Sequence, residues 1–152
     1  MTVPSQARAV IIGGGVVGCS IAYHLGKLGW RDVVLLERKQ LTCGTTWHAA
    51  GLIAQLRATQ NMTRLAKYSQ ELYFGLEAET GVATGIKRNG SITVALSDER
   101  MEELRRLAAM ARAFGVEIDE ISSTDIAARY PGLSVADVVG GVWLPKDGQA
   151  DP

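Results

Sequence analysis

Two short, uniformly apolar runs near the start of the chain flank an amphipathic segment. Residues 8–13 read RAVIIG and residues 32–37 read DVVLLE, and neither shows the polar alternation of a half-exposed strand. Such runs are typical of strands buried on both faces of a parallel sheet. Gly29 stands where a helix between them would end. One apolar helix face is marked by Val17, Ile21, Leu25 and Leu28. Strand, helix and strand within about 30 residues predict a βαβ unit with parallel strands.

The remainder of the chain predicts a mixture of helices and strands. Asn89-Gly90, between alternating apolar residues, is a signal for a two-residue hairpin turn. Ser97 is typical of a helix N-cap and Gly115 of a helix stop. The predicted elements are helices at 61–80, 98–114 and 124–129, a hairpin at 86–96, and strands at 116–118 and 138–144.

These elements predict an α/β fold class. We assign residues 1–60 to a Rossmann-like βαβ dinucleotide-binding unit with the loop that follows it, and residues 61–152 to helices and partial strands of a second sheet. A doubly wound sheet needs more than two parallel strands covered on both faces, and only two are predicted here. We therefore expect an incomplete domain, the amino-terminal part of something larger.

Composition and charge narrow the possible partners. The 152 residues are 47% hydrophobic and 21% charged, which is typical of a globular chain. Sixteen basic and sixteen acidic side chains cancel, so we expect no nucleic-acid or membrane partner. The two cysteines form neither metal-ligand spacing nor a disulfide framework, and no run approaches the roughly 18 apolar residues of a membrane span. No secretory or transit segment precedes the first apolar run, so we expect a cytoplasmic protein.

A glycine motif lies between the first predicted strand and the first predicted helix. Gly13, Gly15 and Gly18 fit the pattern G-x-G-x-x-G. In this pattern Gly13 allows the tight turn, Gly15 lets the backbone approach a pyrophosphate, and Gly18 lets helix and strand pack closely. The N–H groups at the start of the helix would then hold the phosphates. The motif predicts a dinucleotide site.

An acid closes the second predicted strand about 20 residues beyond the glycines. Glu37 stands where a carboxylate can accept hydrogen bonds from an adenosine ribose. The alternative is a surface acid that pairs with Arg38 or Lys39. A 2′-phosphate would meet an opposing charge, so NAD or FAD is favoured over NADP. The βαβ unit itself does not distinguish NAD from FAD.

Three stretches carry a resemblance to a known family: IIGGGVVGCSIAYHLGKLGWRDVVLLE, LTCGTTWHAAGLI and the terminal GGVWLPKDGQADP. They resemble the amine-oxidising flavoproteins of the D-amino-acid-oxidase type, and within these the dimethylglycine and sarcosine dehydrogenases. The likeness covers most of the chain. Many dinucleotide enzymes share the first stretch, whereas residues 46–51 (TWHAAG) are specific to this group. The resemblance implies FAD, a flavin-attachment loop, and the start of a substrate-domain β-sheet at 86–96 and 138–144.

The resemblance also implies a covalent bond from the imidazole of the W-H-A-A-G histidine, here His48, to the 8α-methyl carbon of FAD. An imidazole with an ordinary pKa of about 6.5 is largely neutral and nucleophilic at physiological pH. The alternative is a histidine satisfied by backbone hydrogen bonds beside noncovalent FAD.

Loop residues around this histidine complete the implied cofactor site. For residues 44–46 the alternative is a polar loop that caps a helix. Cys43 is expected to be small and buried, and His24 to be structural. Apart from the glycine motif, Glu37 and His48, the cofactor-binding residues that we predict are Arg38, Gly44, Thr45, Thr46 and Gly51.

The function implied is an FAD-dependent oxidoreductase acting on a secondary or tertiary N-methyl amine of the dimethylglycine or sarcosine class. Hydride would pass from the N-methyl carbon to flavin N5, with demethylation as the outcome and an electron-carrier protein or oxygen as acceptor. The alternatives are a noncovalent flavin enzyme acting on glycine, proline or a D-amino acid, and a non-catalytic nucleotide-binding fragment. Further flavin contacts and substrate-binding residues are expected beyond Pro152, so we expect the chain alone to be inactive.

Overall fold

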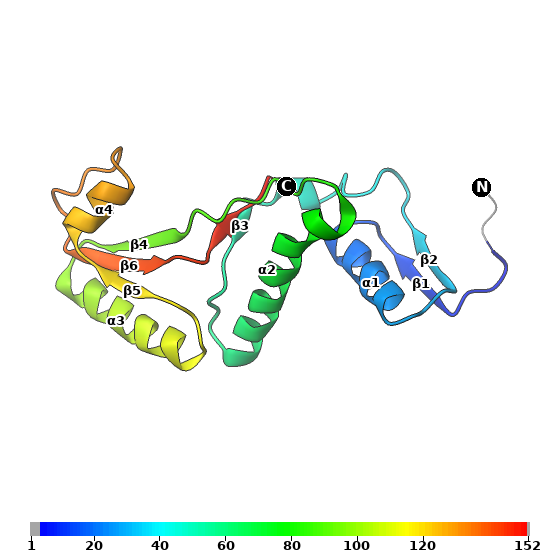
Figure 1. The fold of residues 1–152 in the computed structure, drawn as a ribbon, viewed down its shortest axis with the longest axis horizontal. Coiled ribbons are helices and arrows are strands. Elements are labelled where there is room, and N and C mark those ends of the chain that lie inside the picture. The colour runs from blue at the N-terminus through cyan, green and yellow to red at the C-terminus, as the bar shows by residue number, and fades with distance from the viewer. Residues whose placement is uncertain (1–3, 152) are drawn as a thin grey trace. The chain divides into compact units, whose positions relative to one another are not determined.

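The computed structural model describes residues 4–151, which divide into two compact units (Figure 1). The first unit comprises residues 4–50 and the second residues 51–151. Among the described residues, no helix is long and apolar enough to cross a membrane. Each unit has sheet structure of its own.

The first unit is a βαβ structure. Strand β1 (Ala9–Ile12) pairs in parallel with β2 (Val33–Leu36), in register from Ala9↔Val33 to Ile12↔Leu36. Helix α1 (Val16–Lys27) connects them and packs on both strands. The predicted order of strand, helix and strand is therefore confirmed, and so is the parallel pairing.

Burial of these strands on both faces is not what the structure shows. Ile11 is 7% exposed, whereas its neighbours Val10 and Ile12 are 55% and 87% exposed. Alternate residues of a strand point to opposite faces, so one face of β1 is covered and the other is open. Double burial requires helices on both faces, and among residues 4–50 only α1 contributes a helix longer than one turn.

The glycine turn before α1 has the shape that the motif requires. Gly13 has a φ of +103°, a conformation that side-chain-bearing residues rarely adopt. A Cβ on Gly18 would overlap the carbonyl oxygen of Gly13, so only glycine lets the first turn of the helix approach β1 this closely. Gly29 follows the helix with a φ of +81°, as expected of a helix stop.

A three-stranded antiparallel sheet in the order β4-β6-β5 forms one half of the second unit. Strand β6 (Gly140–Leu144) lies between β4 (Ser91–Ala95) and β5 (Asp119–Ile121). Helix α3 (Asp98–Ala113) packs against these strands, and α4 (Ser123–Arg129) contacts β6. The predicted helices at 98–114 and 124–129 are confirmed, as is the strand at 138–144, which is shorter at its start.

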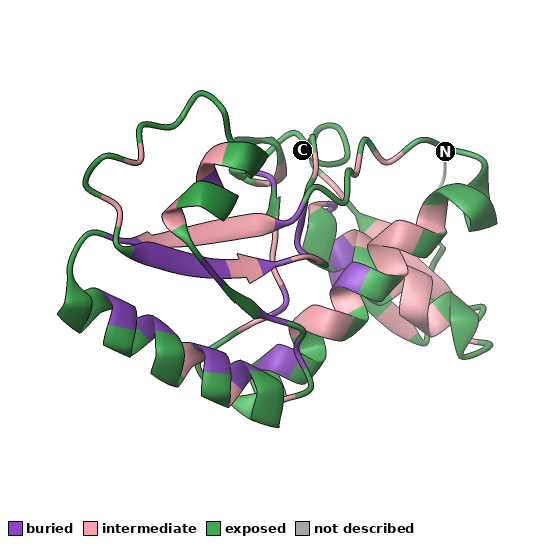
Figure 2. Cartoon of the chain, turned by 60° about the vertical axis from the view of Figure 1, so that its left-hand side comes forward, coloured by how far each residue is buried: buried purple, intermediate pink, exposed green. Residues whose placement is uncertain are grey.

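The core of the second unit lies between α3 and this sheet, where one stripe of the helix is buried (Figure 2). Complete burial of a side chain such as Leu104 contributes about 1.5–3 kcal/mol. Ser97 caps α3 by accepting a hydrogen bond from the Arg100 N–H, as its position predicts. The buried cluster consists of Ala95, Met101, Leu104, Ala108, Ala111, Val116, Ile118, Val142 and Leu144.

The other half of the second unit contains α2 (Gln60–Thr80) and a two-stranded antiparallel pair, β3 (Leu52–Ile53) with β7 (Gly148–Gln149). The predicted helix at 61–80 is confirmed, with Thr59 as its N-cap. Sequence reasoning missed β3 and β7 because two residues are too few to show any periodicity.

Buried polar side chains join α2 to this pair of strands. Gln70 accepts a hydrogen bond from the Gln55 side chain (2.5 Å) and donates to the carbonyl oxygens of Ile53 and Lys146. The Asp147 carboxylate accepts the Gln55 N–H at 3.0 Å and the Ser91 hydroxyl at 2.6 Å. No buried side-chain nitrogen or oxygen of the described residues lacks a partner, as a buried polar network requires.

The predicted hairpin at 86–96 is wrong. Residues before Asn89 do not pair with β4; Lys87 instead forms a bridge with Gln149. Gly90 has the positive φ that its turn signal implies, but its N–H donates to the Asp147 carbonyl oxygen and the Trp143 ring covers its Cα. These long-range partners outweigh the local turn preference.

The strand predicted at 116–118 is displaced rather than absent. Strand β5 begins at Asp119, and the apolar residues Val116 and Ile118 that suggested a strand belong to the buried cluster before it. Burial of these residues produced the apolar pattern without a ladder of backbone hydrogen bonds.

Gly18→Ala tests the close packing of α1 on the glycine turn. We expect the first unit to lose about 1–3 kcal/mol of unfolding free energy, because the new Cβ would force the turn apart. Gly26→Ala in the same helix is the control, since nothing lies within 4 Å of its Cβ and helix propensity should add up to about 1 kcal/mol. Urea unfolding followed by the fluorescence of Trp30 and Trp47 measures both; equal midpoints would contradict the packing argument.

Candidate functional site

The candidate site of the first unit begins with a hydrogen bond between the glycine turn and the end of β2. The Gly14 N–H donates to one carboxylate oxygen of Glu37 at 2.8 Å, and the Lys39 N–H donates to the other at 2.9 Å. Sequence reasoning placed Glu37 near the glycines but missed Gly14. The middle glycine of the GGG run was the available signal, because a Cβ there would lie 2.5 Å from Leu41 and 3.0 Å from the Glu37 side chain.

These two backbone donors also set the charge state of Glu37. The Gly14 N–H, followed by the Lys39 N–H, lowers the pKa of the carboxyl below its ordinary value because both bonds favour the ionised form. Neither Arg38 nor Lys39 forms an ion pair with it among the described side chains, although the Arg38 charge lowers the pKa slightly further. The surface ion pair that was the alternative for Glu37 is therefore not what the structure shows.

The loop after β2 folds back onto the same turn. The Thr42 N–H donates to the Gly14 carbonyl oxygen at 2.9 Å, and Thr42 holds a φ of +63°, which is uncommon for a residue other than glycine. The Thr46 hydroxyl oxygen accepts the Val16 N–H, the first of α1, at 3.0 Å. Thr46 therefore caps the helix, as the polar-loop alternative stated. Thr42 was missed because sequence gives no sign of its backbone conformation.

Gly15 lies next to this loop. It is the N-cap of α1 with an extended backbone, φ −76° and ψ −177°, so its conformation alone does not require glycine. A Cβ would lie 3.2 Å from the Thr46 hydroxyl oxygen and would meet no other atom within 4 Å. Because Gly15 has no side chain, the space next to the first N–H groups of α1 stays open.

His48 ends a single turn of 3-10 helix, Thr46–His48, and its side chain is exposed. Its backbone N–H donates to the Thr45 carbonyl oxygen at 3.1 Å. Its ring lies 3.9 Å from the Trp47 ring, measured between centroids, and Trp47 is itself fixed by a bond to the Cys43 carbonyl oxygen. No described residue hydrogen-bonds to the imidazole nitrogens. The backbone hydrogen bonds to the His48 imidazole that the alternative expected are therefore absent among the described residues.

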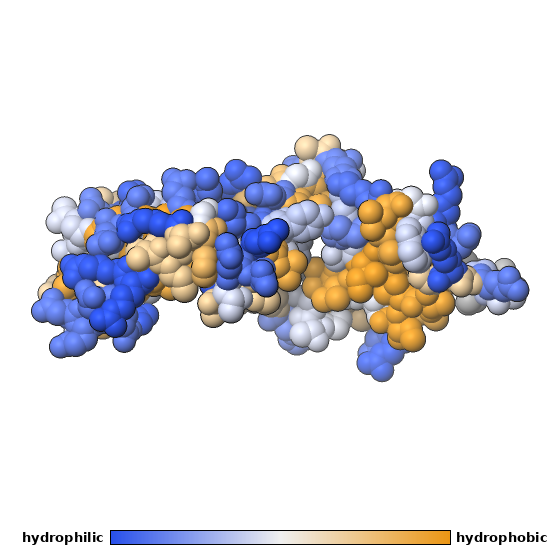
Figure 3. Space-filling model, turned by 90° about the horizontal axis from the view of Figure 1, so that it is seen from below, coloured by the Kyte–Doolittle hydropathy of each residue, from blue (hydrophilic) through white to orange (hydrophobic). Residues whose placement is uncertain are grey.

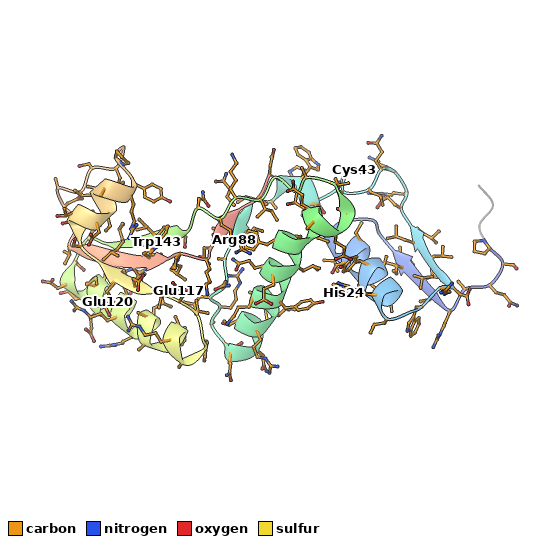
Figure 4. All side chains as sticks on the ribbon, viewed as in Figure 1. His24, Cys43, Arg88, Glu117, Glu120 and Trp143 are labelled. Carbon is orange, nitrogen blue, oxygen red and sulfur yellow. The ribbon has the colours of Figure 1, made fainter. Side chains whose placement is uncertain are left out.

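The remaining residues that were predicted to bind the cofactor contribute less to the candidate site. Gly44 and Arg38 are exposed, and nothing lies within 4 Å of a Cβ built on Gly44. Gly51 belongs to the second unit, where it is buried with a φ of +74° and its carbonyl oxygen accepts the Ala150 N–H at 2.7 Å. Cys43 is exposed, so its predicted burial is wrong; it lies at the surface of a loop (Figure 4).

His24 has a local structural role, as expected. Its Nδ1 lies 2.6 Å from the Ser20 carbonyl oxygen on the preceding turn of α1. A carbonyl oxygen can only accept, so Nδ1 carries the proton in this contact. Among the described residues, no group of three or more histidine, cysteine or acidic side chains could hold a metal ion.

Apolar side chains are exposed over the first unit (Figure 3). They come from both strands, from α1 and from the loop that ends in the candidate site. On a parallel sheet, an exposed apolar surface of this kind is typically covered by further helices or strands. The most exposed are Val10, Ile12, Val17, Leu28, Leu41 and Trp47.

Comparison with known proteins identifies a family to which the chain is similar. Residues 8–152 match the FAD dependent oxidoreductase family, DAO. The chain is 43% identical to human mitochondrial sarcosine dehydrogenase over 98% of its length, and 42% identical to rat mitochondrial dimethylglycine dehydrogenase over 97%. It is also 41% identical to a mouse protein named mitochondrial pyruvate dehydrogenase phosphatase regulatory subunit, again over 97%. The chain spans 16–17% of the length of these relatives.

A solved structure is similar over nearly all of the chain. The L-proline dehydrogenase of P. horikoshii matches 99% of this chain and 39% of its own with a TM-score of 0.91, at 30% sequence identity. The mixed α/β fold described above is therefore a fold of FAD-dependent oxidoreductases, as predicted.

The acid sensitivity of the first unit tests the role of Glu37. Its folded-state pKa is lowered, so its stabilising contribution is present above its ordinary value of 4.5 and is lost as the pH falls through the lower folded-state pKa. Glu37→Gln should unfold at lower urea than wild type at about pH 7, and the difference should shrink below about pH 4. Glu71→Gln, at an exposed acid of α2, is the control. A difference that is unchanged across this range would contradict the role of the charge.

Proposed function

The chain belongs to the DAO family of FAD dependent oxidoreductases, and on this basis we propose that it is the flavin-binding part of an enzyme that oxidises a secondary or tertiary N-methyl amine. One observation carries the proposal. The loop that bears His48 is fixed to the glycine turn by two hydrogen bonds, from Thr42 to Gly14 and from Val16 to Thr46. The phosphate-binding turn and the flavin loop are thus one structure within the first unit.

The residues of this unit fit a dinucleotide. The open space above Gly15 admits a pyrophosphate to the start of α1, where backbone N–H groups and the helix dipole favour negative charge. Each Glu37 oxygen accepts one backbone N–H, and a carboxylate has about four acceptor sites, so capacity remains for two ribose hydroxyls. Its ionised state disfavours a 2′-phosphate. When bound, the flavin would supply the hydride acceptor at N5.

His48 is the residue that we propose as the covalent anchor of FAD. Its imidazole is exposed, makes no hydrogen bond to another described residue, and stands on a turn fixed by the Trp47 bond to Cys43. Ala49 and Ala50 follow it, so on the side of His48 away from Trp47 in sequence no large side chain would obstruct a ring edge. Bonding an imidazole nitrogen of His48 to the 8α-methyl carbon would release two protons, one from the imidazole N–H and one from the methyl C–H, and pass two electrons to the carrier protein or oxygen that accepts electrons from the enzyme.

The substrate we propose is an N-methyl amino acid of the sarcosine or dimethylglycine class, and the reaction is hydride transfer with demethylation. The 42–43% identity to the sarcosine and dimethylglycine dehydrogenases supports this class. Electrons would leave to a carrier protein or to oxygen. We propose a cytoplasmic location, although several relatives are named mitochondrial. Cell fractionation distinguishes the two locations.

A second candidate is a non-catalytic nucleotide-binding role. The specific observation in its favour is that a relative named as a phosphatase regulatory subunit is almost as similar, at 41%, as the named dehydrogenases. A noncovalent flavin enzyme acting on an amino acid such as proline is a third candidate, and the likeness to a solved protein named L-proline dehydrogenase supports that substrate. Flavin that stays with the protein after acid precipitation would distinguish the covalent enzyme from these two alternatives. We expect residues 1–152 alone to bind flavin without turnover.

His48→Ala is expected to leave folded, FAD-binding protein in which the flavin is dissociable and amine oxidation is slower. Activity should fall without vanishing, because hydride transfer occurs at N5 and not at the methyl carbon. Mass spectrometry of peptides from the denatured, active full-length protein measures the attachment. If the peptide containing Trp47-His48-Ala49 carries no flavin mass, the covalent claim fails and the noncovalent enzyme replaces it.

Gly15→Val should abolish FAD binding while the second unit stays folded. The branched side chain would occupy the space above the helix start and press on the Thr46 hydroxyl. Gly26→Val introduces the same side chain in the same helix, where nothing lies within 4 Å of the new Cβ, and should still bind FAD. The flavin-to-protein ratio after purification is the measurement. A Gly15→Val protein with a normal ratio would show that this turn does not hold the phosphates.

A further inference from the structure

Trp47 stands directly before His48 and does not belong to the core of the first unit. Its side chain is 59% exposed, so burial of its ring contributes little to the stability of this unit. A large aromatic ring usually stabilises a fold through the apolar area that it buries. The contacts that Trp47 makes within its own loop therefore need another explanation.

A series of contacts sets the position of Trp47 from the glycine turn outward. The Gly14 carbonyl oxygen accepts the Thr42 N–H at 2.9 Å, and Thr42 holds its uncommon φ of +63°. The next residue is Cys43, whose carbonyl oxygen accepts the Trp47 indole N–H at 3.1 Å. The indole nitrogen is a donor only, so this bond satisfies it and fixes one end of the ring system.

The Trp47 ring in turn contacts the imidazole of His48. The two ring centroids lie 3.9 Å apart, and the ring planes make an angle of 39°. Aromatic pairs already interact favourably at centroid distances of about 4.5–7 Å, so these two rings are in close contact. Side chains at adjacent positions of a helix do not normally face each other. The contact therefore depends on the direction in which the Cys43 bond turns the indole.

His48 has no comparable constraint from hydrogen bonds. None of the described residues hydrogen-bonds to its imidazole nitrogens. In histidines with a chemical role, a hydrogen bond to one ring nitrogen commonly sets the ring and its tautomer. The torsion that turns the imidazole about its bond to Cβ is otherwise broad. The contact with Trp47 thus restricts a ring that would rotate freely, and it leaves both nitrogens open to bond formation.

The same aromatic ring can stabilise a charge on the imidazole. When a His48 nitrogen bonds to the 8α-methyl carbon, the imidazole is positively charged until its N–H proton is lost. A cation within about 6 Å of an aromatic centroid is attracted to the ring, and tryptophan attracts it most strongly. The distance of 3.9 Å between the two centroids lies within that range. With oxygen as the acceptor, the two protons and two electrons released overall form hydrogen peroxide.

We propose that Trp47 is the positioning residue for covalent attachment of FAD: its ring holds the His48 imidazole and stabilises the positive charge that forms on it. This inference rests on the proposed function, because it takes His48 as the covalent anchor. Trp47 acts through His48 and not on FAD itself. It therefore governs the rate of attachment and leaves noncovalent FAD binding unchanged.

The first test follows flavin attachment in full-length apoprotein mixed with FAD in aerated buffer. Trp47→Leu should lower the rate constant of attachment by about 10- to 100-fold and leave the Kd for FAD within about 2-fold, because a misplaced reacting group slows the step without loss of the phosphate site. Trp47→Phe keeps an aromatic face but loses the bond to Cys43, and should fall between. Trp30→Leu removes the indole that lies 4.0 Å from the Arg8 guanidinium in the same unit, and should match wild type. Flavin retained after acid precipitation measures attachment, and quenching of FAD fluorescence measures Kd.

A second test uses fluorinated tryptophan to separate charge stabilisation from shape. Fluorine withdraws electron density from the indole with little change in its size, so each added fluorine weakens the attraction of the ring for a cation. The rate constant of attachment should fall stepwise as tryptophan with one and then with several fluorine atoms is incorporated. In Trp47→Phe, where the label enters only the other tryptophans, fluorination should have no effect. A wild-type rate that ignores fluorination would overturn the proposal.

The outcomes also separate this inference from the proposed function. If the wild-type protein attaches no flavin, the anchor at His48 fails and the inference fails with it. If wild type attaches flavin and Trp47→Leu does so at the same rate, the anchor stands and the inference alone fails. Loss of noncovalent FAD binding in Trp47→Leu would likewise overturn it, because Trp47 would then hold the loop and not the imidazole.

Discussion

The hydrogen bond from the Gly14 N–H to the Glu37 carboxylate is the interaction on which the first unit depends. It ties the turn after β1 to the end of β2, two points 23 residues apart in sequence. The loop that carries His48 then attaches to the same turn through Thr42 and Thr46. A single acid therefore fixes the glycine turn to which the loop that carries His48 is attached, and its ionised form is stabilised by the backbone N–H groups that it binds.

The second unit uses a buried acid in the same way. Asp147 accepts from the Gln55 backbone, 92 residues away, and from the Ser91 side chain, 56 residues away. Losing either donor would leave a buried carboxylate short of partners, which costs more than the bond itself contributes. The network formed with Gln70 joins α2 to β3 and to the segment before β7, so its polar residues hold these elements together.

The sequence predicted those features of the fold that local patterns of residues determine. The apolar runs at 8–13 and 32–37, the spacing in α1 and the capping signals of α3 are local patterns, and each correctly predicted its element. The burial of both strand faces, which depends on elements elsewhere in the fold, was not predicted correctly. Asn89-Gly90 failed because its conformation is set by Asp147 and Trp143, more than 50 residues away. In the site, motif spacing brought Glu37 and the glycines together. It could not place the Gly14 bond or the backbone of Thr42, which depend on tertiary contacts.

The pairing of β1 with β2 has a consequence for how this sheet can grow. Within residues 4–50 each strand has one neighbour, so the outer edge of each presents a row of unpaired N–H and C=O groups. Such an edge is a template for another strand, which can join it in either direction. A parallel strand would need a crossover connection of a dozen or more residues, whereas an antiparallel strand can follow a tight turn. The amino-terminal βαβ unit thereby leaves two edges at which its sheet can be extended.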